Sequence, residues 1–69
     1  MFPNIHRCCG LHEHVEVHYH VDEYEARLHR DADDSVAASG RGPDVESALR
    51  DLDAQLIGVT LDHIRGRRP

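Results

Sequence analysis

Four histidines and one glutamate recur at every second position between residues 12 and 20. They are His12, His14, Glu16, His18 and His20, and they alternate with the apolar residues Val15, Val17, Tyr19 and Val21. Neutral imidazole is a good ligand for zinc, nickel and copper. Residues i and i+2 of a β-strand face the same side, so His12 with His14, or His18 with His20, could give two nitrogens to one ion. The spacing therefore indicates a candidate metal site on one face of a strand.

The strict two-residue period predicts a β-strand over residues 12–21, with valine and tyrosine on its buried face. A second strand is predicted over residues 24–30, where Tyr24, Ala26 and Leu28 alternate with Glu25, Arg27 and His29. A tight turn at residues 22–23 would place His29 opposite Glu16, which adds His29 to the candidate ligands. The same register places Arg27 opposite His18, which disfavours a cation there. The simpler interpretation of the histidine face is a polar surface that stays in solvent or contacts a partner.

Three further segments complete the predicted fold. A short third strand is expected over residues 35–39, before a stretch that contains glycine and proline. A helix is expected over residues 44–65, because apolar residues recur there at spacings of three and four. Residues 1–10 are expected to form an irregular N-terminal arm. The sequence thus predicts a single α+β domain over residues 1–69, in which a three-stranded antiparallel meander (12–39) carries one long C-terminal helix on its apolar face.

The predicted helix is longer than the strands that it would cover. A helix of about 21 residues spans roughly 31 Å, whereas a strand of about eight residues spans roughly 26 Å. Ile57, Leu61 and Ile64 form a second apolar ridge on the overhanging part. We expect this ridge to pack on the N-terminal arm, through Phe2 and Ile5, or on another chain. A rival interpretation ends the helix near Gln55 and makes residues 56–61 a fourth strand.

The composition favours a small binding protein over an enzyme. At 69 residues, with no tryptophan and one phenylalanine, the chain has few large core residues, so self-association would add apolar burial. The sequence contains no glycine-rich phosphate loop and no nucleophile spaced next to a base, which argues against common enzyme classes. No apolar run reaches membrane-spanning length and no signal peptide is recognisable, so a cytoplasmic location without a membrane partner is expected.

Cys8 and Cys9 are adjacent, and we expect reduced thiols because a vicinal disulfide requires a strained ring. Together with His6 and His12, they provide ligand types that suit zinc. Neighbouring side chains of an extended segment point in opposite directions, however, so two adjacent thiols rarely reach one ion.

A face of histidine and arginine could also stack on nucleic-acid bases. The formal net charge of −5 opposes this hypothesis, because phosphate binding requires dense positive charge. Arginines cluster only at the C-terminal end, where Arg65, Arg67 and Arg68 suit the negative end of a helix dipole. Nucleic acid is therefore a disfavoured partner.

The segment Ala38-Ser39-Gly40, followed by Asp44-Val45-Glu46-Ser47-Ala48-Leu49, resembles the last strand and second helix of ribosome hibernation (sigma-54 modulation) factors. In that family a strand ends in a short glycine-containing turn before an Asp-x-x-x-Ala-Ile type of helix start. The order of three strands and a helix is also similar to that of HicB-type antitoxins. Both resemblances imply a non-catalytic regulator that acts by contact, and neither assigns a site residue.

The leading hypothesis is a small non-enzymatic regulatory protein that binds a macromolecular partner, in first place a protein. Its binding residues would lie on the open sheet face (His14, His18, His20, Arg27) or on the second apolar ridge (Ile57, Leu61, Ile64). A homodimer through one of these surfaces is expected, because a three-stranded sheet leaves its edges unpaired. One alternative is a metal-binding module for Zn, Ni or Cu that uses His12, His14, His18, His20 and His29. Another is a ribosome- or RNA-associated factor. No cofactor other than such a metal is expected.

Overall fold

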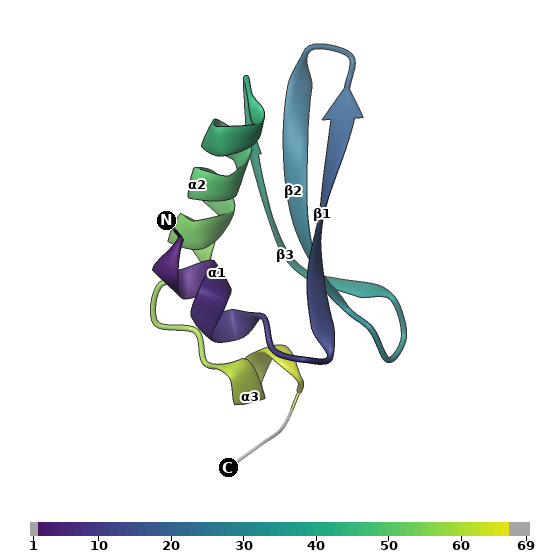
Figure 1. Cartoon of the computed structure of the whole chain (residues 1–69), viewed down its shortest axis with the longest axis vertical. Helices are drawn as coiled ribbons and strands as arrows, with labels where there is room; N and C mark the ends of the chain where they lie inside the picture. The colour runs from purple at the N-terminus through teal and green to yellow at the C-terminus, as the bar shows by residue number, and fades with distance from the viewer. Residues whose placement is uncertain (1, 67–69) are drawn as a thin grey trace.

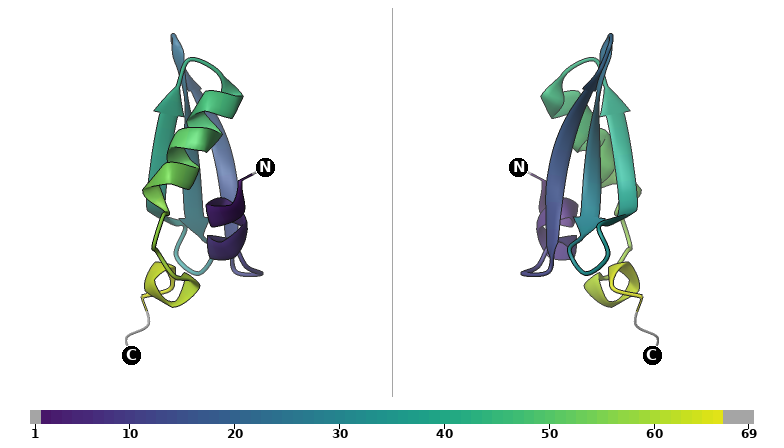
Figure 2. Two further views of the ribbon diagram at one scale, coloured as in Figure 1. Left: turned by 90° about the vertical axis from the view of Figure 1, so that its left-hand side faces the viewer. Right: turned by 90° about the vertical axis from the view of Figure 1, so that its right-hand side faces the viewer.

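The sheet is built from three consecutive antiparallel strands. In the computed structural model, which describes residues 2–66, the strands β1 (Glu13–His20), β2 (Glu23–Arg30) and β3 (Ser35–Gly42) lie in the order β1-β2-β3 (Figure 1). Helix α1 (Pro3–Cys8) precedes the strands, and helices α2 (Val45–Gln55) and α3 (Leu61–Ile64) follow them. Helix α2 crosses one face of the sheet, and no described helix lies in front of the other face (Figure 2). The predicted α+β class with an antiparallel meander is therefore confirmed.

The first hairpin follows the alternation of its sequence, but its register differs from the predicted one by two residues. Tyr19 pairs with Tyr24, Val17 pairs with Ala26, and the turn consists of residues 21–22. A shift of two residues leaves every side chain on its predicted face, so the alternation does not distinguish the two registers. An aromatic pair favours the observed one, since the rings of Tyr19 and Tyr24 lie 4.9 Å apart between centroids.

Val21 occupies the first position of this turn with a positive φ of 51°. A β-branched residue is strained in that region, whereas glycine adopts it freely. The side chain is 88% exposed, so its removal loses little packing. We therefore expect V21G to stabilise the fold by about 0.5 kcal/mol, or a few degrees in thermal unfolding followed by circular dichroism. A lower melting temperature for V21G would show that Val21 is not strained.

Helix α2 packs on β3 and β2 through a narrow stripe of apolar residues. Ala48, Leu52 and Leu56 are buried, as are Ala26 and Leu28 on the facing side of β2. These residues form one cluster, so the apolar spacing predicted for the helix is observed in the core at Ala48, Leu52 and Leu56, whereas Val45 is 42% exposed. None of the helices within residues 2–66 combines the length and the apolar character that crossing a bilayer requires.

The start of α2 and its distance from β3 are both set by individual residues. The side chain of Asp44 accepts a hydrogen bond from the backbone N–H of Ser47 at 2.7 Å and thereby caps the helix. Gly40 of β3 lies beneath the helix, where a Cβ would fall 2.1 Å from the backbone nitrogen of Leu52. The helix therefore approaches β3 more closely than any residue with a side chain would permit.

The prediction of one long helix over residues 44–65 is wrong. Helix α2 ends at Gln55, and Gly58 follows with a φ of +77°, a conformation in which glycine commonly terminates helices. The chain then forms α3, and residues 56–61 do not form a fourth strand. The apolar pattern continued through the break because α3 returns to the same core.

The three residues of the predicted overhanging ridge have different environments. Ile57 is 70% exposed in the connection after α2, Leu61 is half-buried, and Ile64 is only 3% exposed in the core. The ridge is therefore not a continuous free surface, and Ile64 is not available to a partner. Arg67 and Arg68, which we expected near the end of the helix, lie outside the described residues.

The prediction of an irregular arm over residues 1–10 is also wrong, since this segment contains helix α1. Long-range contacts with α2 hold this short helix in place. The carboxylate of Asp53 accepts a hydrogen bond from the backbone N–H of Ile5 at 2.8 Å. In the other direction, Arg7 donates to the backbone oxygen of Leu56 at 2.7 Å. A local sequence pattern does not reveal caps that come from residues so far along the chain.

Helix α2 covers β3 and β2, whereas β1 lies farthest from it in the sheet (Figure 1). Val17 is 42% exposed and Tyr19 is 63% exposed, although both lie on the same face as the fully buried Leu28. A helix about 10 Å wide covers roughly two strands that lie about 4.8 Å apart. The predicted burial of the whole apolar face is therefore wrong for the outer part of β1.

Candidate metal centre

The sheet face opposite α2 buries two titratable side chains. On β2, His29 is 6% exposed and Glu25 is 7% exposed, although no described helix covers this face (Figure 2). Strand β2 is the central strand, so long side chains from both of its neighbours can close over it. Each of these two buried groups consequently has a defined set of polar contacts.

His29 is positioned by an irregularity between β2 and β3. Strand β3 contributes one extra residue, Ala37, opposite the step from Leu28 to His29. Such a bulge increases the local twist and redirects the side chains beside it. The chain then turns through residues 31–34, and Asp34, with a φ of 57°, brings its carboxylate to 3.3 Å from Nδ1 of His29.

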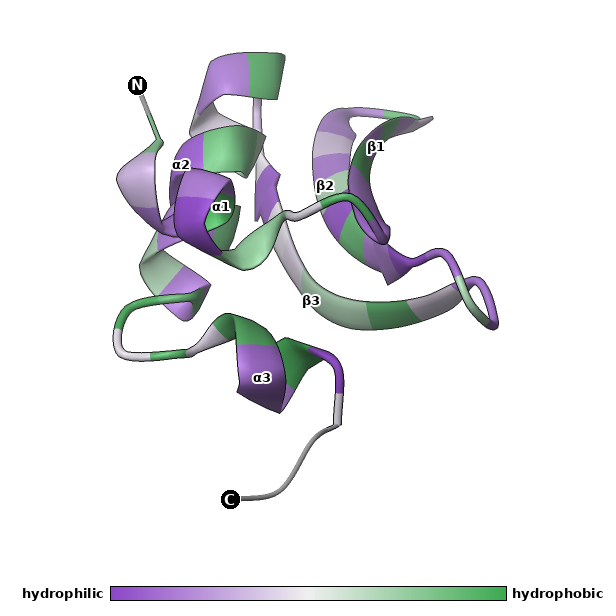
Figure 3. Ribbon diagram, turned by 60° about the horizontal axis from the view of Figure 1, so that its bottom comes forward, coloured by the Kyte–Doolittle hydropathy of each residue, from purple (hydrophilic) through white to green (hydrophobic). Residues whose placement is uncertain are grey.

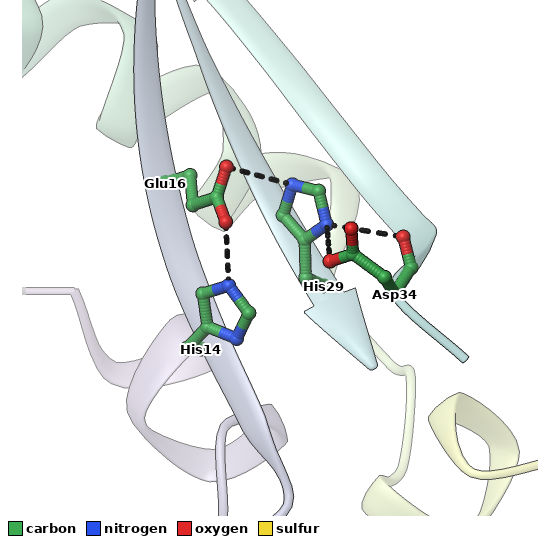
Figure 4. Close-up of side chains that lie close together, drawn as sticks. All are labelled: His14, Glu16, His29 and Asp34. Carbon is green, nitrogen blue, oxygen red and sulfur yellow. Dashed lines mark hydrogen bonds and ion pairs between the residues drawn. The ribbon is translucent and has the colours of Figure 1, made fainter. Parts of the chain in front are cut away.

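Glu16 on β1 lies at the centre of a group of imidazoles. Its Oε2 lies 2.7 Å from Nε2 of His14, and its Oε1 lies 3.0 Å from Nε2 of His18 and 3.5 Å from Nε2 of His29. Figure 4 shows His14, Glu16, His29 and Asp34 directed toward one another from two strands and a turn. These four residues offer ligand atoms within 4.8 Å of one another, and within residues 2–66 they form the only cluster of three or more such residues.

The imidazoles of His14 and His29 are held in the same way. Their rings are nearly parallel, at an angle of 8° and a centroid distance of 5.1 Å. Nδ1 of His14 lies 2.5 Å from the carboxylate of Asp31, and Nδ1 of His29 lies 3.3 Å from that of Asp34. A carboxylate on the far nitrogen fixes the tautomer and the orientation of a metal-binding imidazole. In this arrangement both Nε2 atoms and Glu16 could serve as ligands, with the two aspartates as orienting groups.

Nε2 of His29 is buried and has no hydrogen-bond partner among the described residues. The carboxylate of Glu16, 3.5 Å away, is an acceptor. Nδ1 of the same ring faces the carboxylate of Asp34 at 3.3 Å, so two carboxylates lie beside this buried imidazole. An unpaired buried polar atom lowers stability by about 1–3 kcal/mol. A cation between this nitrogen and Glu16 would remove that penalty.

The electrostatics of the cluster favour positive charge. Hydrogen bonds with Glu16 and Asp31 raise the pKa of His14 above its ordinary value. Hydrogen bonds with His14 and His18 lower the pKa of Glu16 below its ordinary range. A divalent ion that displaced the protons of the imidazoles would experience the same negative field.

The structure separates the five histidines that the sequence indicated as ligands. His14 and His29 belong to the cluster, whereas His18 contacts Glu16 from farther along β1. His20 instead contacts Glu25 at 2.9 Å, and His12 precedes β1 and is exposed. The i, i+2 pairs of the sequence hypothesis therefore do not form the cluster, which is assembled across two strands.

Three carboxylates of the site were not predicted as its members. Glu16 was expected only as the residue opposite His29, and Asp31 and Asp34 were not considered. The sequence feature that could have suggested Asp31 and Asp34 is their position in the turn directly after the strand that carries His29. Only the observed fold shows that this turn folds back over the sheet face.

A second polar cluster surrounds Glu25 nearer the other end of β2. Its Oε1 accepts hydrogen bonds from Nε of Arg27 and from Nε2 of His20, both at 2.9 Å, and Arg41 lies 3.9 Å from Oε2. The hydrogen bond from Arg27 is the largest cause that lowers the pKa of Glu25 to about 2, and the His20 contact adds to it. Arg27 and His20, predicted as partner-binding residues, are therefore engaged within the sheet.

We expect acid to destabilise the protein through Glu25. A carboxyl group with a lowered folded-state pKa stabilises the fold above its unfolded pKa, here 4.5, and this contribution is lost as the pH falls toward 2. The melting temperature of the wild type should therefore drop steeply between about pH 5 and pH 2. Glu25→Gln should melt lower at neutral pH and show a shallower drop on acidification. Parallel pH profiles of the two proteins would contradict this role.

The cysteines do not contribute to the candidate centre. Both are free thiols, Cys8 in the core and Cys9 half-buried with its Sγ 3.3 Å from the backbone oxygen of Glu13. Burial, followed by the charge of Glu13, raises the pKa of Cys9, which disfavours the thiolate that metals bind. The set of His6, Cys8, Cys9 and His12 forms no ligand cluster in the part of the chain that the structure describes.

Comparisons of the chain with protein-family models, with curated proteins and with solved structures found no match. The resemblances to ribosome hibernation factors and to HicB-type antitoxins therefore stay predictions.

Proposed function

We propose that the chain is a metal-binding module that holds one divalent transition-metal ion, in first place zinc, between β1 and β2. The observation that carries this proposal is the buried Nε2 of His29, which has no hydrogen-bond partner among the described residues and lies 3.5 Å from the carboxylate of Glu16. The matching orientation of His14, with Nε2 toward Glu16 and Nδ1 toward Asp31, supports it independently.

The donor set selects the class of metal. Two imidazole nitrogens and one carboxylate suit Zn²⁺, Ni²⁺ and Cu²⁺, whereas Mg²⁺ and Ca²⁺ prefer oxygen ligands alone. Three protein ligands leave one position of a tetrahedral zinc ion open to water or to a group of a partner. The side chains of His14 and Glu16 are 42% and 41% exposed, so an ion can enter from solvent while His29 holds it from the buried side.

Titration of metal-free, untagged protein with zinc tests the proposal. The expected result is saturation at one ion per chain together with a higher melting temperature, since the ion binds only the folded state. Glu16→Gln removes the shared carboxylate and should abolish stoichiometric binding. His12→Ala is the matched control, because His12 is exposed and outside the cluster. Absence of saturable binding by the wild type, or an equal loss in His12→Ala, would contradict the proposed centre.

The orienting carboxylate of His14 gives a separate prediction. Asp31→Asn keeps the size of the side chain but removes the charge that lies 2.5 Å from Nδ1 of His14. Loss of such a group typically weakens metal affinity by roughly 10–100-fold, and we expect an effect in this range in calorimetric titrations. Asp22→Asn, in the exposed hairpin turn, is the control and should bind zinc as the wild type does. Unchanged affinity in Asp31→Asn would remove Asp31 from the site.

A second candidate function is regulation by contact with a protein partner. The observation that favours it is the apolar surface of β1, where Val17 and Tyr19 remain exposed next to an unpaired strand edge. The polar side of the sheet offers less to a partner, because Arg27 is paired with Glu25 and Glu16 contacts three histidines. A contact-based role would therefore use the edge and apolar side of β1.

A further inference from the structure

The outer edge of β1 carries unpaired backbone groups. Strand β1 lies at one end of the sheet and pairs only with β2. The backbone oxygen of His12 accepts a hydrogen bond from the backbone N–H of Asp31 at 2.9 Å, so the even-numbered residues direct their backbone groups toward β2. The backbone N–H and C=O groups of the odd-numbered residues Val15, Val17 and Tyr19 therefore point away from the sheet.

This edge lacks the features that usually protect edge strands. Residues 13–20 contain no proline and no lysine, and they pair with β2 without a bulge. The opposite edge strand, β3, is interrupted by the bulge at Ala37. Figure 3 shows apolar and polar residues alternating along β1, away from α2, and Val17 and Tyr19 are 42% and 63% exposed there.

We propose that a second copy of the chain occupies this edge, in an antiparallel pairing of β1 with β1 centred on Val17. In this register Glu16 lies opposite His18 of the second copy, so two complementary pairs form across the two-fold axis. His14 lies opposite His20, and Val15 lies opposite Tyr19. Apolar residues thus face apolar residues in this register, and Glu16 faces an imidazole.

Other registers are less favourable. Centring the pair on Glu16 would place two carboxylates directly opposite each other. A shift by one residue would join the polar face of one sheet to the apolar face of the other. Centring on His18 would extend the pairing beyond His20, where β1 ends and the turn begins. Centring on Val15 would also place His14 opposite Glu16, but it would pair only residues 13–17 of β1, so strand length selects the pairing centred on Val17.

The proposed dimer is a continuous six-stranded sheet with both α2 helices on the same face. The exposed Val17 and Tyr19 of one copy then lie beside Val17 and Val15 of the other, so each chain reduces the exposed apolar area of its partner. The interaction uses backbone groups at the edge, and its pairing of Glu16 with His18 shares Glu16 with the candidate metal centre. The dimer is therefore tested with metal excluded, and metal binding is tested by variants that leave Val17 in place.

Sedimentation equilibrium in the presence of a chelator tests the dimer without interference from metal bridging. The wild type should approach twice the chain mass of 7.8 kDa as its concentration rises. Val17→Lys places two ammonium groups against each other at the two-fold axis and should weaken self-association at least tenfold. Val36→Lys, at an equally exposed valine on β3, should leave it unchanged. A wild type that stays monomeric, or a Val17→Lys protein that dimerises as the wild type does, would overturn the proposal.

Cross-linking tests the register. Residues that face each other in a hydrogen-bonded antiparallel pair have Cα atoms about 5.5 Å apart, which is within disulfide range. Val17→Cys should therefore form a covalent dimer on mild oxidation that reductant reverses, and Val36→Cys should not. The wild type serves as the control, because it shows how much covalent dimer Cys8 and Cys9 form by themselves. Equal yields of covalent dimer from both variants, or none from Val17→Cys, would overturn the pairing centred on Val17.

Discussion

Replacing Gly40 by alanine is expected to lower the melting temperature by roughly 15 °C or more. The added Cβ would lie 2.1 Å from the backbone nitrogen of Leu52 and 2.7 Å from the carbonyl carbon of Asp51. Both atoms belong to the backbone of α2, so no side-chain rotation relieves the clash. The helix would have to move away from β3, which loosens the packing of Leu52 and Ala48 and costs about 3 kcal/mol, the upper part of the range for overpacking.

Gly10→Ala is the matched control for this substitution. A Cβ at Gly10 would lie 2.7 Å from a terminal nitrogen of Arg65 and 3.2 Å from Oε1 of Glu13, the ends of two flexible side chains. Small rotations can relieve these contacts, so the melting temperature should fall by only a few degrees. Thermal unfolding followed by circular dichroism measures both variants. If Gly40→Ala melted as Gly10→Ala does, the close packing of α2 on β3 would be contradicted.

His29→Leu is expected to change metal affinity and metal-free stability in opposite directions. Removing the buried ligand should weaken zinc binding by at least about 100-fold, more than the loss of an orienting group. Leucine also removes the unpaired Nε2, so the metal-free protein should be as stable as the wild type or more stable. Thermal unfolding in chelator and in excess zinc separates the two effects.

The matched control is His20→Leu, which removes an imidazole from the same strand face but outside the cluster. The melting temperature of this variant should still rise when zinc is added, because both Nε2 ligands and Glu16 remain. A stability loss in metal-free His29→Leu would show that the imidazole is well satisfied in the fold. Zinc stabilisation that persisted in His29→Leu would remove His29 from the site.

The sequence pattern predicted the meander because the alternation in the first hairpin is strict over both strands. The faces of β1 and β2 were therefore correct, but periodicity carries no information about a shift of two residues, and the turn was misplaced. Tertiary contacts decide between these registers, here including the tilted contact between the rings of Tyr19 and Tyr24. We also expected the helix to cover the whole apolar face, including β1, but a single helix is too narrow to cover three strands.

The C-terminal half was mispredicted because Gly58 was not recognised as a helix terminator. Its positive φ is the usual signal for the end of a helix, and the sequence offered the glycine at this position. Apolar residues continue at helical spacing beyond it only because α3 packs against the same core. The sequence pattern gave little indication of helix α1, since its first turn is capped by Asp53 of α2 and Arg7 holds it against the backbone of Leu56.

The sequence allowed the type of ligand in the candidate site to be predicted, but not the individual residues that form the site. The sequence indicated imidazole ligands on the polar face of the hairpin, with His29 directly opposite Glu16. In the observed register His29 lies opposite His14, and its side chain approaches Glu16 diagonally at 3.5 Å. The additional carboxylates come from the turn after β2, whose return over the sheet depends on the positive φ of Asp34 and on the bulge at Ala37. The alternation of apolar and polar residues in the strands does not predict either feature.

The metal centre is tested most directly by long-range ¹H–¹⁵N spectra of the histidine rings, recorded before and after addition of one equivalent of zinc. The Nε2 resonances of His14 and His29 should move to the positions of metal-bound nitrogen, while their Nδ1 atoms stay protonated toward Asp31 and Asp34. The resonances of His12 and His20 should not move. Unchanged spectra, or shifts confined to the i, i+2 pairs His12 with His14 or His18 with His20, would contradict the centre built from two strands.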